Sequence, residues 1–128
     1  MSCNEETVVK YLRAMEGSGD LDAIASLLAV DFLQVEYSSR FLNGPKQRNK
    51  AQTIDSIRRG LAAVVSQQHT LLDIITERDT VACTLVWRAY ERSETTLGRR
   101  NSILETNNAM FFKLRAGLIA RQTIYVCF

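Results

Sequence analysis

The sequence lacks any apolar stretch long enough to cross a membrane, and it lacks the basic start of a secretory signal. A membrane-spanning helix needs roughly 20 consecutive apolar residues. A signal sequence begins with positive charge, whereas this chain begins MSCNEETVVKYL. Both absences predict a cytoplasmic protein with no membrane partner.

Cysteine and histidine are also scarce. The three cysteines, Cys3, Cys83 and Cys127, are too far apart for a metal-binding pair, and their apolar surroundings predict buried free thiols. His69 is the single histidine, which excludes metal sites built from several imidazoles. We expect it to be structural, with a place at a pocket mouth as the alternative. No phosphate-binding glycine loop is present, so we expect neither metal nor cofactor.

Positive charge is small and dispersed. The formal net charge is +2, and short basic groups such as Arg58–Arg59 and Arg99–Arg100 lie far apart along the chain. A nucleic-acid interface needs basic residues gathered on one face. We therefore expect no nucleic-acid partner.

The N-terminal half shows apolar residues at helical spacing in three segments. The first helix ends at Gly17–Ser18–Gly19, and the second begins at Asp20. An extended segment is expected at Phe32–Tyr37. A loop over Ser38–Lys50, which could hold a short strand at Arg40–Leu42, leads into the third helix.

The C-terminal half changes to alternation with a period of two. This predicts a meander of four long strands, Gln67–Glu77, Thr80–Arg92, Ser102–Arg115 and Leu118–Phe128. In the last two strands the even-numbered residues should face the core. Helices followed by strands indicate an α+β fold, and 128 residues suit one domain spanning 1–128. A long curved sheet around three helices should leave a one-ended cavity.

The strand expected at Thr80–Arg92 is apolar on both faces. Cys83 and Leu85 alternate with Ala82 and Val86, so neither side of the strand is polar. The helices can cover only one of these faces. We therefore expect a homodimer that forms through the outer face of the sheet.

Three blocks, VVKYLRAM, GDLDAIASLLAVDF and FFKLRAGLI, together with Asn43–Gly44, resemble the SnoaL-like group of the nuclear transport factor 2 superfamily. Members include ketosteroid isomerase, limonene-epoxide hydrolase, scytalone dehydratase and polyketide cyclases. The resemblance covers essentially the whole chain. It implies a cystatin-like α+β barrel, in which a cone-shaped, curved, mixed and mostly antiparallel sheet wraps around three helices from the N-terminal half.

The resemblance to ketosteroid isomerase implies roles for three positions. Glu36 stands where that enzyme has its general base, and Tyr11 stands where it has its oxyanion tyrosine. Met110 occupies the position of the protonated acid, and Asn108 is the nearest polar substitute. An inward-facing carboxylate is desolvated, which raises its pKa toward that of a useful base.

The resemblance to limonene-epoxide hydrolase implies another arrangement. Gln34 and Glu36 fall at its two water-holding positions, whereas Val86 and Ile124 stand where its relay needs charge. Trp87 and Arg88 face opposite ways, and the two enzymes disagree on which points inward. The expected ligand-binding set comprises Gln34, Asn108, Met110, Met15, Phe32, Trp87, Arg88 and Ile124.

These observations predict a cofactor-independent enzyme of isomerase or cyclase type. Glu36 would move a proton and Tyr11 would stabilise an oxygen on a small hydrophobic molecule bearing a carbonyl or hydroxyl group. Three alternatives stay open: a non-catalytic protein that binds a small hydrophobic ligand, an epoxide-hydrolase-like enzyme, and a protein-interaction module.

Overall fold

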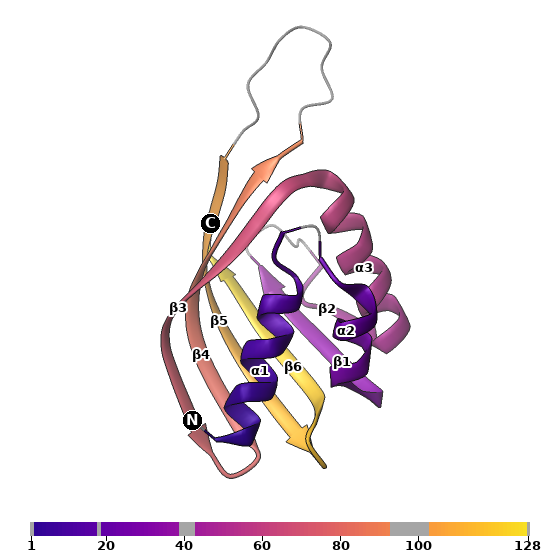
Figure 1. The fold of residues 1–128 in the computed structure, drawn as a ribbon, viewed down its shortest axis with the longest axis vertical. Coiled ribbons are helices and arrows are strands. Elements are labelled where there is room, and N and C mark those ends of the chain that lie inside the picture. Colours follow the sequence, from indigo (N-terminus) through magenta and orange to yellow (C-terminus); the bar gives the residue numbers. More distant parts are fainter. Residues whose placement is uncertain (1, 18, 39–42, 93–102, 128) are drawn as a thin grey trace, which may run out of the picture.

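The computed structural model describes residues 2–17, 19–38, 43–92 and 103–127. Within them, helices and strands follow the order α1 (Cys3–Ala14), α2 (Leu21–Leu27), β1 (Leu28–Ser38), β2 (Lys46–Asn49), α3 (Lys50–Ala63), β3 (Val64–Glu77), β4 (Thr80–Glu91), β5 (Ile103–Arg115) and β6 (Leu118–Cys127). The helices lie together on one side of a curved sheet (Figure 1). This arrangement confirms the predicted α+β class.

Each helix begins at a polar cap. The hydroxyl of Ser2 accepts a hydrogen bond from the backbone of Glu5, and the carboxylate of Asp20 accepts one from Ala23. Asn49 forms a reciprocal capping box at the start of α3. These side chains satisfy backbone N–H groups that a helix leaves free at its start. They fix where each helix begins relative to the sheet.

The sheet is open, and its strand order is β2-β1-β6-β5-β4-β3. The four C-terminal strands form the predicted meander, and β1 pairs with β6 in parallel. β2 pairs antiparallel with the other side of β1. A mixed, mostly antiparallel sheet therefore brings the first strand beside the last one.

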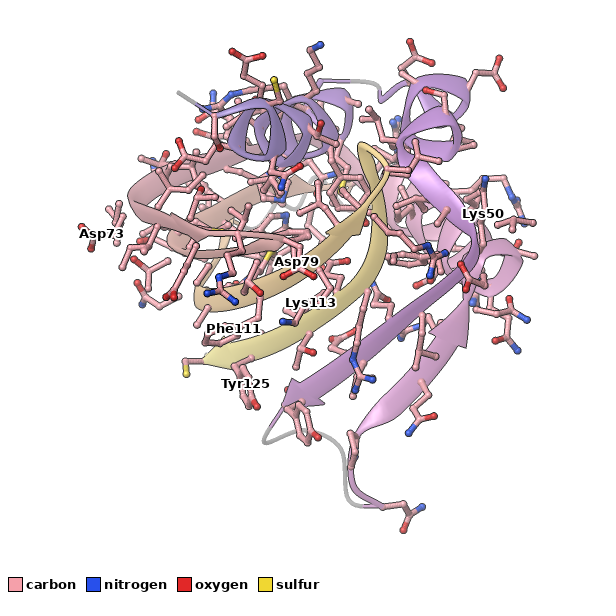
Figure 2. The ribbon with its side chains drawn as sticks, turned by 90° about the horizontal axis from the view of Figure 1, so that it is seen from below. Lys50, Asp73, Asp79, Phe111, Lys113 and Tyr125 are labelled. Atoms are coloured by element: carbon pink, nitrogen blue, oxygen red, sulfur yellow. The ribbon has the colours of Figure 1, made fainter. Side chains whose placement is uncertain are left out.

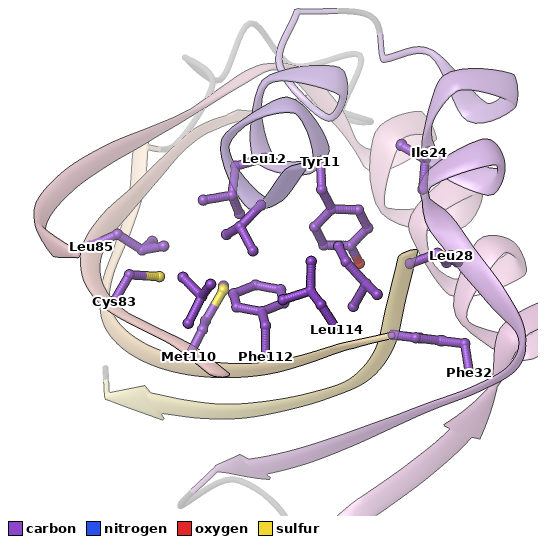
Figure 3. Packing of buried hydrophobic residues seen from close by; sticks show 13 residues of the cluster. Tyr11, Leu12, Ile24, Leu28, Phe32, Cys83, Leu85, Met110, Phe112 and Leu114 are labelled. Carbon is purple, nitrogen blue, oxygen red and sulfur yellow. The ribbon is translucent and has the colours of Figure 1, made fainter. Parts of the chain in front are cut away.

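The core lies between α1 and the inner face of the sheet (Figure 3). Met110, Phe112 and Leu114 of β5 are buried there, whereas Phe111 and Lys113 are exposed on the other face. The predicted alternation of even-numbered residues toward the core is thus confirmed for this strand. Tyr11 and Leu12 point from α1 onto these side chains.

Three local predictions are wrong. The segment expected to be a loop contains β2, and β1 begins at Leu28 rather than at Phe32. Cys3 and Cys127 are exposed, although all three thiols were expected to be buried. Cys83 is buried, and this burial raises the pKa of its thiol to about 11. The strand expected at Arg40–Leu42 lies outside the described residues.

The outer face of the sheet carries exposed aromatic side chains. Phe111 and Tyr125 project from the side opposite the helices (Figure 2). No helix in the described part of the chain is both long and apolar enough to cross a membrane.

Candidate functional site

A cavity of about 380 Å³ lies between the helices and the inner face of the sheet. Side chains from α1, α3 and five of the six strands form its wall, which combines apolar groups with amides, one carboxylate and the imidazole. The lining residues are Tyr11, Met15, Gln34, Glu36, Ser56, Ile57, Gly60, Gln67, His69, Trp87, Thr106, Asn108, Met110, Gln122, Ile124 and Val126.

Glu36 and Gln34 are two residues apart on β1, so both side chains point to the same side of the strand. Arg48 of β2 lies directly opposite Gln34. Its Nη1 donates to Glu36 Oε1 over 2.8 Å and to Gln34 Oε1 over 3.0 Å. The side chains of Arg48 and Glu36 are only 17% and 23% exposed, so water screens this charged pair weakly. The carboxylate is thereby held in one orientation at the cavity wall.

Gln122 of β6 continues this polar row, because Gln34 lies beside it in the parallel pair. Gln122 Oε1 accepts hydrogen bonds from Gln34 Nε2 at 3.0 Å and from the Tyr11 hydroxyl at 3.2 Å. These two bonds turn Gln122 Nε2 toward Met110 Sδ, 3.5 Å away. A hydrogen-bonded chain therefore connects Arg48 to Tyr11 across three strands and one helix.

Tyr11 reaches the centre of the molecule from α1 and is completely buried. Burial raises the pKa of its hydroxyl well above the usual value for tyrosine, so the group stays protonated and remains a donor. Its bond to Gln122 is longer than the 2.5–3.0 Å typical of hydroxyl donors. An incoming oxygen atom could compete for this proton.

The opposite wall is built by β3 and β4. The Trp87 indole N–H donates to Gln67 Oε1 over 2.7 Å, and Gln67 Nε2 donates to the backbone oxygen of Met15 over 2.8 Å. The indole is therefore fixed against the end of α1. Trp87 faces the cavity, which decides the orientation that the sequence left open.

His69 lies on the same wall and is 5% exposed. Desolvation lowers the pKa of its imidazole to about 4; the charge of Glu16 opposes this shift and that of Arg13 adds to it. The ring is consequently neutral at pH 7. Burial acts to raise the pKa of Glu16. Hydrogen bonds from the Arg13 side chain and the His69 backbone N–H, together with the charges of the Arg13 and His69 side chains, outweigh burial and leave this pKa lowered.

Eight predicted site residues share this cavity, namely Glu36, Tyr11, Gln34, Asn108, Met110, Met15, Trp87 and Ile124. Phe32 and Arg88 do not. Phe32 is 1% exposed within the core cluster. Arg88 projects from the outer face, where its guanidinium lies 3.2 Å from the carboxylate of Glu105. Alternation along β4 forces this placement once Trp87 points inward.

Gln122, Gln67 and Arg48 are functional candidates that the sequence reasoning did not select. Alternation had placed Gln122 on the inner face, so its polar character there was the available signal. Arg48 gave no such signal, because the segment containing it was expected to be a loop. Nowhere in the described ranges do three or more His, Cys, Asp or Glu side chains gather as a metal site.

The sequence model of the SnoaL-like domain family matches residues 8–122. No curated protein matches the chain significantly. Among solved structures, IdmH, a candidate polyketide cyclase from Streptomyces antibioticus, is similar with a TM-score of 0.78 and 20% identity. The alignment covers 96% of this chain and 91% of that one.

Two further structures show the same fold. A candidate SnoaL-like polyketide cyclase from Jannaschia has a TM-score of 0.75 and 15% identity, with 97% of this chain and 85% of that chain covered. A protein with a ketosteroid isomerase-like fold from Catenulispora acidiphila has a TM-score of 0.73 and 17% identity, with coverages of 94% and 84%. At these identities the similarity establishes the fold alone.

Proposed function

Because this chain belongs to the SnoaL-like domain family, we propose that it is a cofactor-independent enzyme of isomerase or cyclase type. Its substrate is a small, largely apolar molecule with a carbonyl or hydroxyl group, bound in the cavity of about 380 Å³. The observation that carries this proposal is the position of the Glu36 carboxylate on the wall of a cavity that also contains donors for an oxygen atom.

Glu36 acts as the proton carrier in this proposal. One carboxylate oxygen takes a proton from the carbon beside the substrate carbonyl, and the electron pair of that C–H bond moves onto the carbonyl oxygen as an enolate forms. In a substrate with a β,γ carbon–carbon double bond, return of the proton to the γ carbon re-forms the carbonyl, moves the double bond to the α,β position and completes an isomerisation. Arg48 Nη1, 2.8 Å from Glu36 Oε1, aims the carboxylate and keeps it from turning away.

Tyr11 supplies a hydrogen bond to the developing negative charge. Gln122 supplies a second donor, because the partner of its Nε2 is the thioether sulfur of Met110, a weak acceptor. A ligand oxygen that replaced the sulfur would form a stronger hydrogen bond. Met110 stands where the resemblance places a protonated acid, so the amide of Gln122 compensates for the missing donor.

A test that needs no natural substrate is exchange of the acidic protons of 2-tetralone in deuterium oxide, followed by NMR. The parent should accelerate exchange, and Glu36→Gln should slow it by about 100-fold or more, the usual contribution of a positioned base. Tyr11→Phe should reduce the rate by about 100-fold through loss of an oxyanion donor. Glu105→Gln is the matched control, since Glu105 is a paired carboxylate on the outer face.

Equal rates for the parent and Glu36→Gln would refute the enzymatic role. A non-catalytic binding protein is the second candidate, favoured by the ion pair that already occupies Glu36 Oε1. It predicts that 2-tetralone binds to the parent without any exchange above the buffer rate. We do not propose epoxide-hydrolase chemistry, because Val86 and Ile124 stand where that relay needs charge, and Arg88 lies outside the cavity.

A further inference from the structure

The wall formed by β3 and β4 contains a polar atom with no partner. Among the described residues, two buried side-chain atoms lack a hydrogen bond, Thr53 Oγ1 and His69 Nδ1, and of these two residues only His69 lines the cavity. Leaving a buried polar atom unpaired costs roughly 1–3 kcal/mol. Because the His69 ring lines the cavity, a polar group of a ligand that pairs with this ring would remove that cost.

Polar side chains of β3 and of nearby β5 are engaged with the protein itself. Both polar atoms of the Gln67 side chain are used, one by Trp87 and one by Met15. The Thr106 hydroxyl donates to Asn108 Oδ1 over 2.9 Å. The imidazole of His69 therefore still has an unused hydrogen-bonding atom. Because that atom is buried, leaving it unused is costly.

His69 also lies far from Glu36 in the sheet. It stands on β3, an edge strand, whereas Glu36 stands on β1, and β6, β5 and β4 separate the two. The sheet is curved (Figure 1), and both residues line the same cavity. A ligand that reaches both must bridge the cavity from the β1 wall to the β3 wall.

We propose that His69 is a specificity-determining residue that binds a hydroxyl group at the end of the ligand remote from Glu36. The preferred ligand is then a ring compound with polar groups at both ends and an apolar middle. This inference rests on the proposed function only in placing the reacting end at Glu36.

A hydroxyl fits the chemistry of the imidazole better than a carbonyl or an ammonium group. The neutral ring offers one donor and one acceptor, and either nitrogen can carry the proton. A hydroxyl both donates and accepts, so it pairs with whichever nitrogen faces the ligand. A carbonyl oxygen only accepts hydrogen bonds, so it pairs only with the tautomer whose N–H faces the ligand. An ammonium group would lose its water shell here without gaining a free carboxylate as a partner.

The test compares naphthalene-2,6-diol with 6-methyl-2-naphthol, which have the same rings and differ by a hydroxyl in place of a methyl group. His69 is the single histidine, so ¹⁵N-histidine labelling reports on this ring alone. We expect saturation with the diol to shift the ring ¹⁵N resonances and saturation with the methyl compound to leave them nearly unchanged. Equal shifts, or no binding of the diol, would overturn the proposal.

Calorimetric affinities for parent, His69→Phe and His69→Asn complete the comparison. The ratio of diol to methyl-compound affinity should fall about two- to tenfold in His69→Phe, the worth of one hydrogen bond, and less in His69→Asn, which keeps polar atoms. An unchanged ratio in His69→Phe contradicts the proposal. If that variant does not fold, the labelled parent and His69→Asn decide. These titrations involve no turnover, so failure of 2-tetralone exchange and failure of the His69 contact are distinguishable.

Discussion

At the scale of single residues, Arg48 determines how the polar side chains on one wall of the cavity are oriented. Its Nη1 contacts both Glu36 Oε1 and Gln34 Oε1, so the amide of Gln34 must present its nitrogen to Gln122. That choice in turn presents Gln122 Oε1 to the Tyr11 hydroxyl. One guanidinium therefore determines the direction of every hydrogen bond in the chain.

Replacing Arg48 should damage both folding and catalysis. We expect Arg48→Met to lower the free energy of unfolding by about 1–3 kcal/mol, because Glu36 and Gln34 lose a charged donor at a partly buried site. The rate of 2-tetralone exchange should also fall, since Glu36 loses the donor that holds its carboxylate in one orientation. Urea unfolding and the NMR exchange rate measure the two effects.

The matched control is Arg88→Met, since Arg88 forms an ion pair whose side chains are about half exposed. Such surface pairs contribute at most about 1 kcal/mol. Equal losses of stability in Arg48→Met and Arg88→Met would show that the inner pair has no special importance.

His69 makes stability depend on pH. The pKa of its imidazole is about 4 in the folded protein and about 6.5 when unfolded, so the unfolded chain binds more protons between these values. The free energy of unfolding should rise from pH 4 to 6.5 by roughly 3 kcal/mol from this group and stay level above. Urea unfolding at several pH values should show a shallower slope for His69→Asn than for the parent; identical slopes would contradict the burial of a neutral ring.

At the scale of elements, strands with one buried face were predictable from the sequence and β2 was not. Alternation identified β5 and β6 because one side of each packs on the core. β2 has four residues, Lys46–Asn49, and none is fully buried, so no hydrophobic pattern marks it. The family resemblance predicted Glu36 and Tyr11 as site residues, and both line the cavity. Their hydrogen-bond partners Arg48 and Gln122 depend on strand register, which the sequence does not show.

The turn between α1 and α2 brings the backbone close to α3. Gly19 has φ +77°, and a Cβ there would clash with Cδ1 of Leu61. Gly17 has φ +64° with nothing within 4 Å of its Cβ position. We expect Gly17→Ala to cost about 1–2 kcal/mol from backbone strain alone. Gly19→Ala should cost more, because Leu61 must also move.

Urea unfolding of the two glycine variants tests this difference. Gly60→Ala serves as a control of opposite sign, since Gly60 lies within α3 with open space at its Cβ position. Alanine there should stabilise the helix by up to about 1 kcal/mol. A cost for Gly19→Ala no larger than that for Gly17→Ala would mean that the approach to Leu61 is energetically unimportant.

For the whole molecule, the notable feature of the outer face of the sheet is a group of exposed aromatic side chains. Tyr37, Phe111 and Tyr125, here called the aromatic triad, come from three adjacent strands. Tyr37 and Tyr125 stack with centroids 4.9 Å apart, and Phe111 meets Tyr125 edge-on at 6.0 Å. The three side chains remain 39–46% exposed despite these contacts. Each would bury further apolar area against a second copy of the chain.

We therefore predict that the chain self-associates through the aromatic triad. Tyr125→Lys should shift the protein toward monomer in sedimentation velocity, because a buried ammonium group at a sheet-on-sheet contact would lose its hydration without a partner. Val30→Lys is the control, since Val30 is 91% exposed and lies outside the triad. Its sedimentation should match that of the parent. The prediction is wrong if the parent sediments as a monomer at all concentrations. It is also wrong if the parent self-associates and Tyr125→Lys self-associates to the same extent.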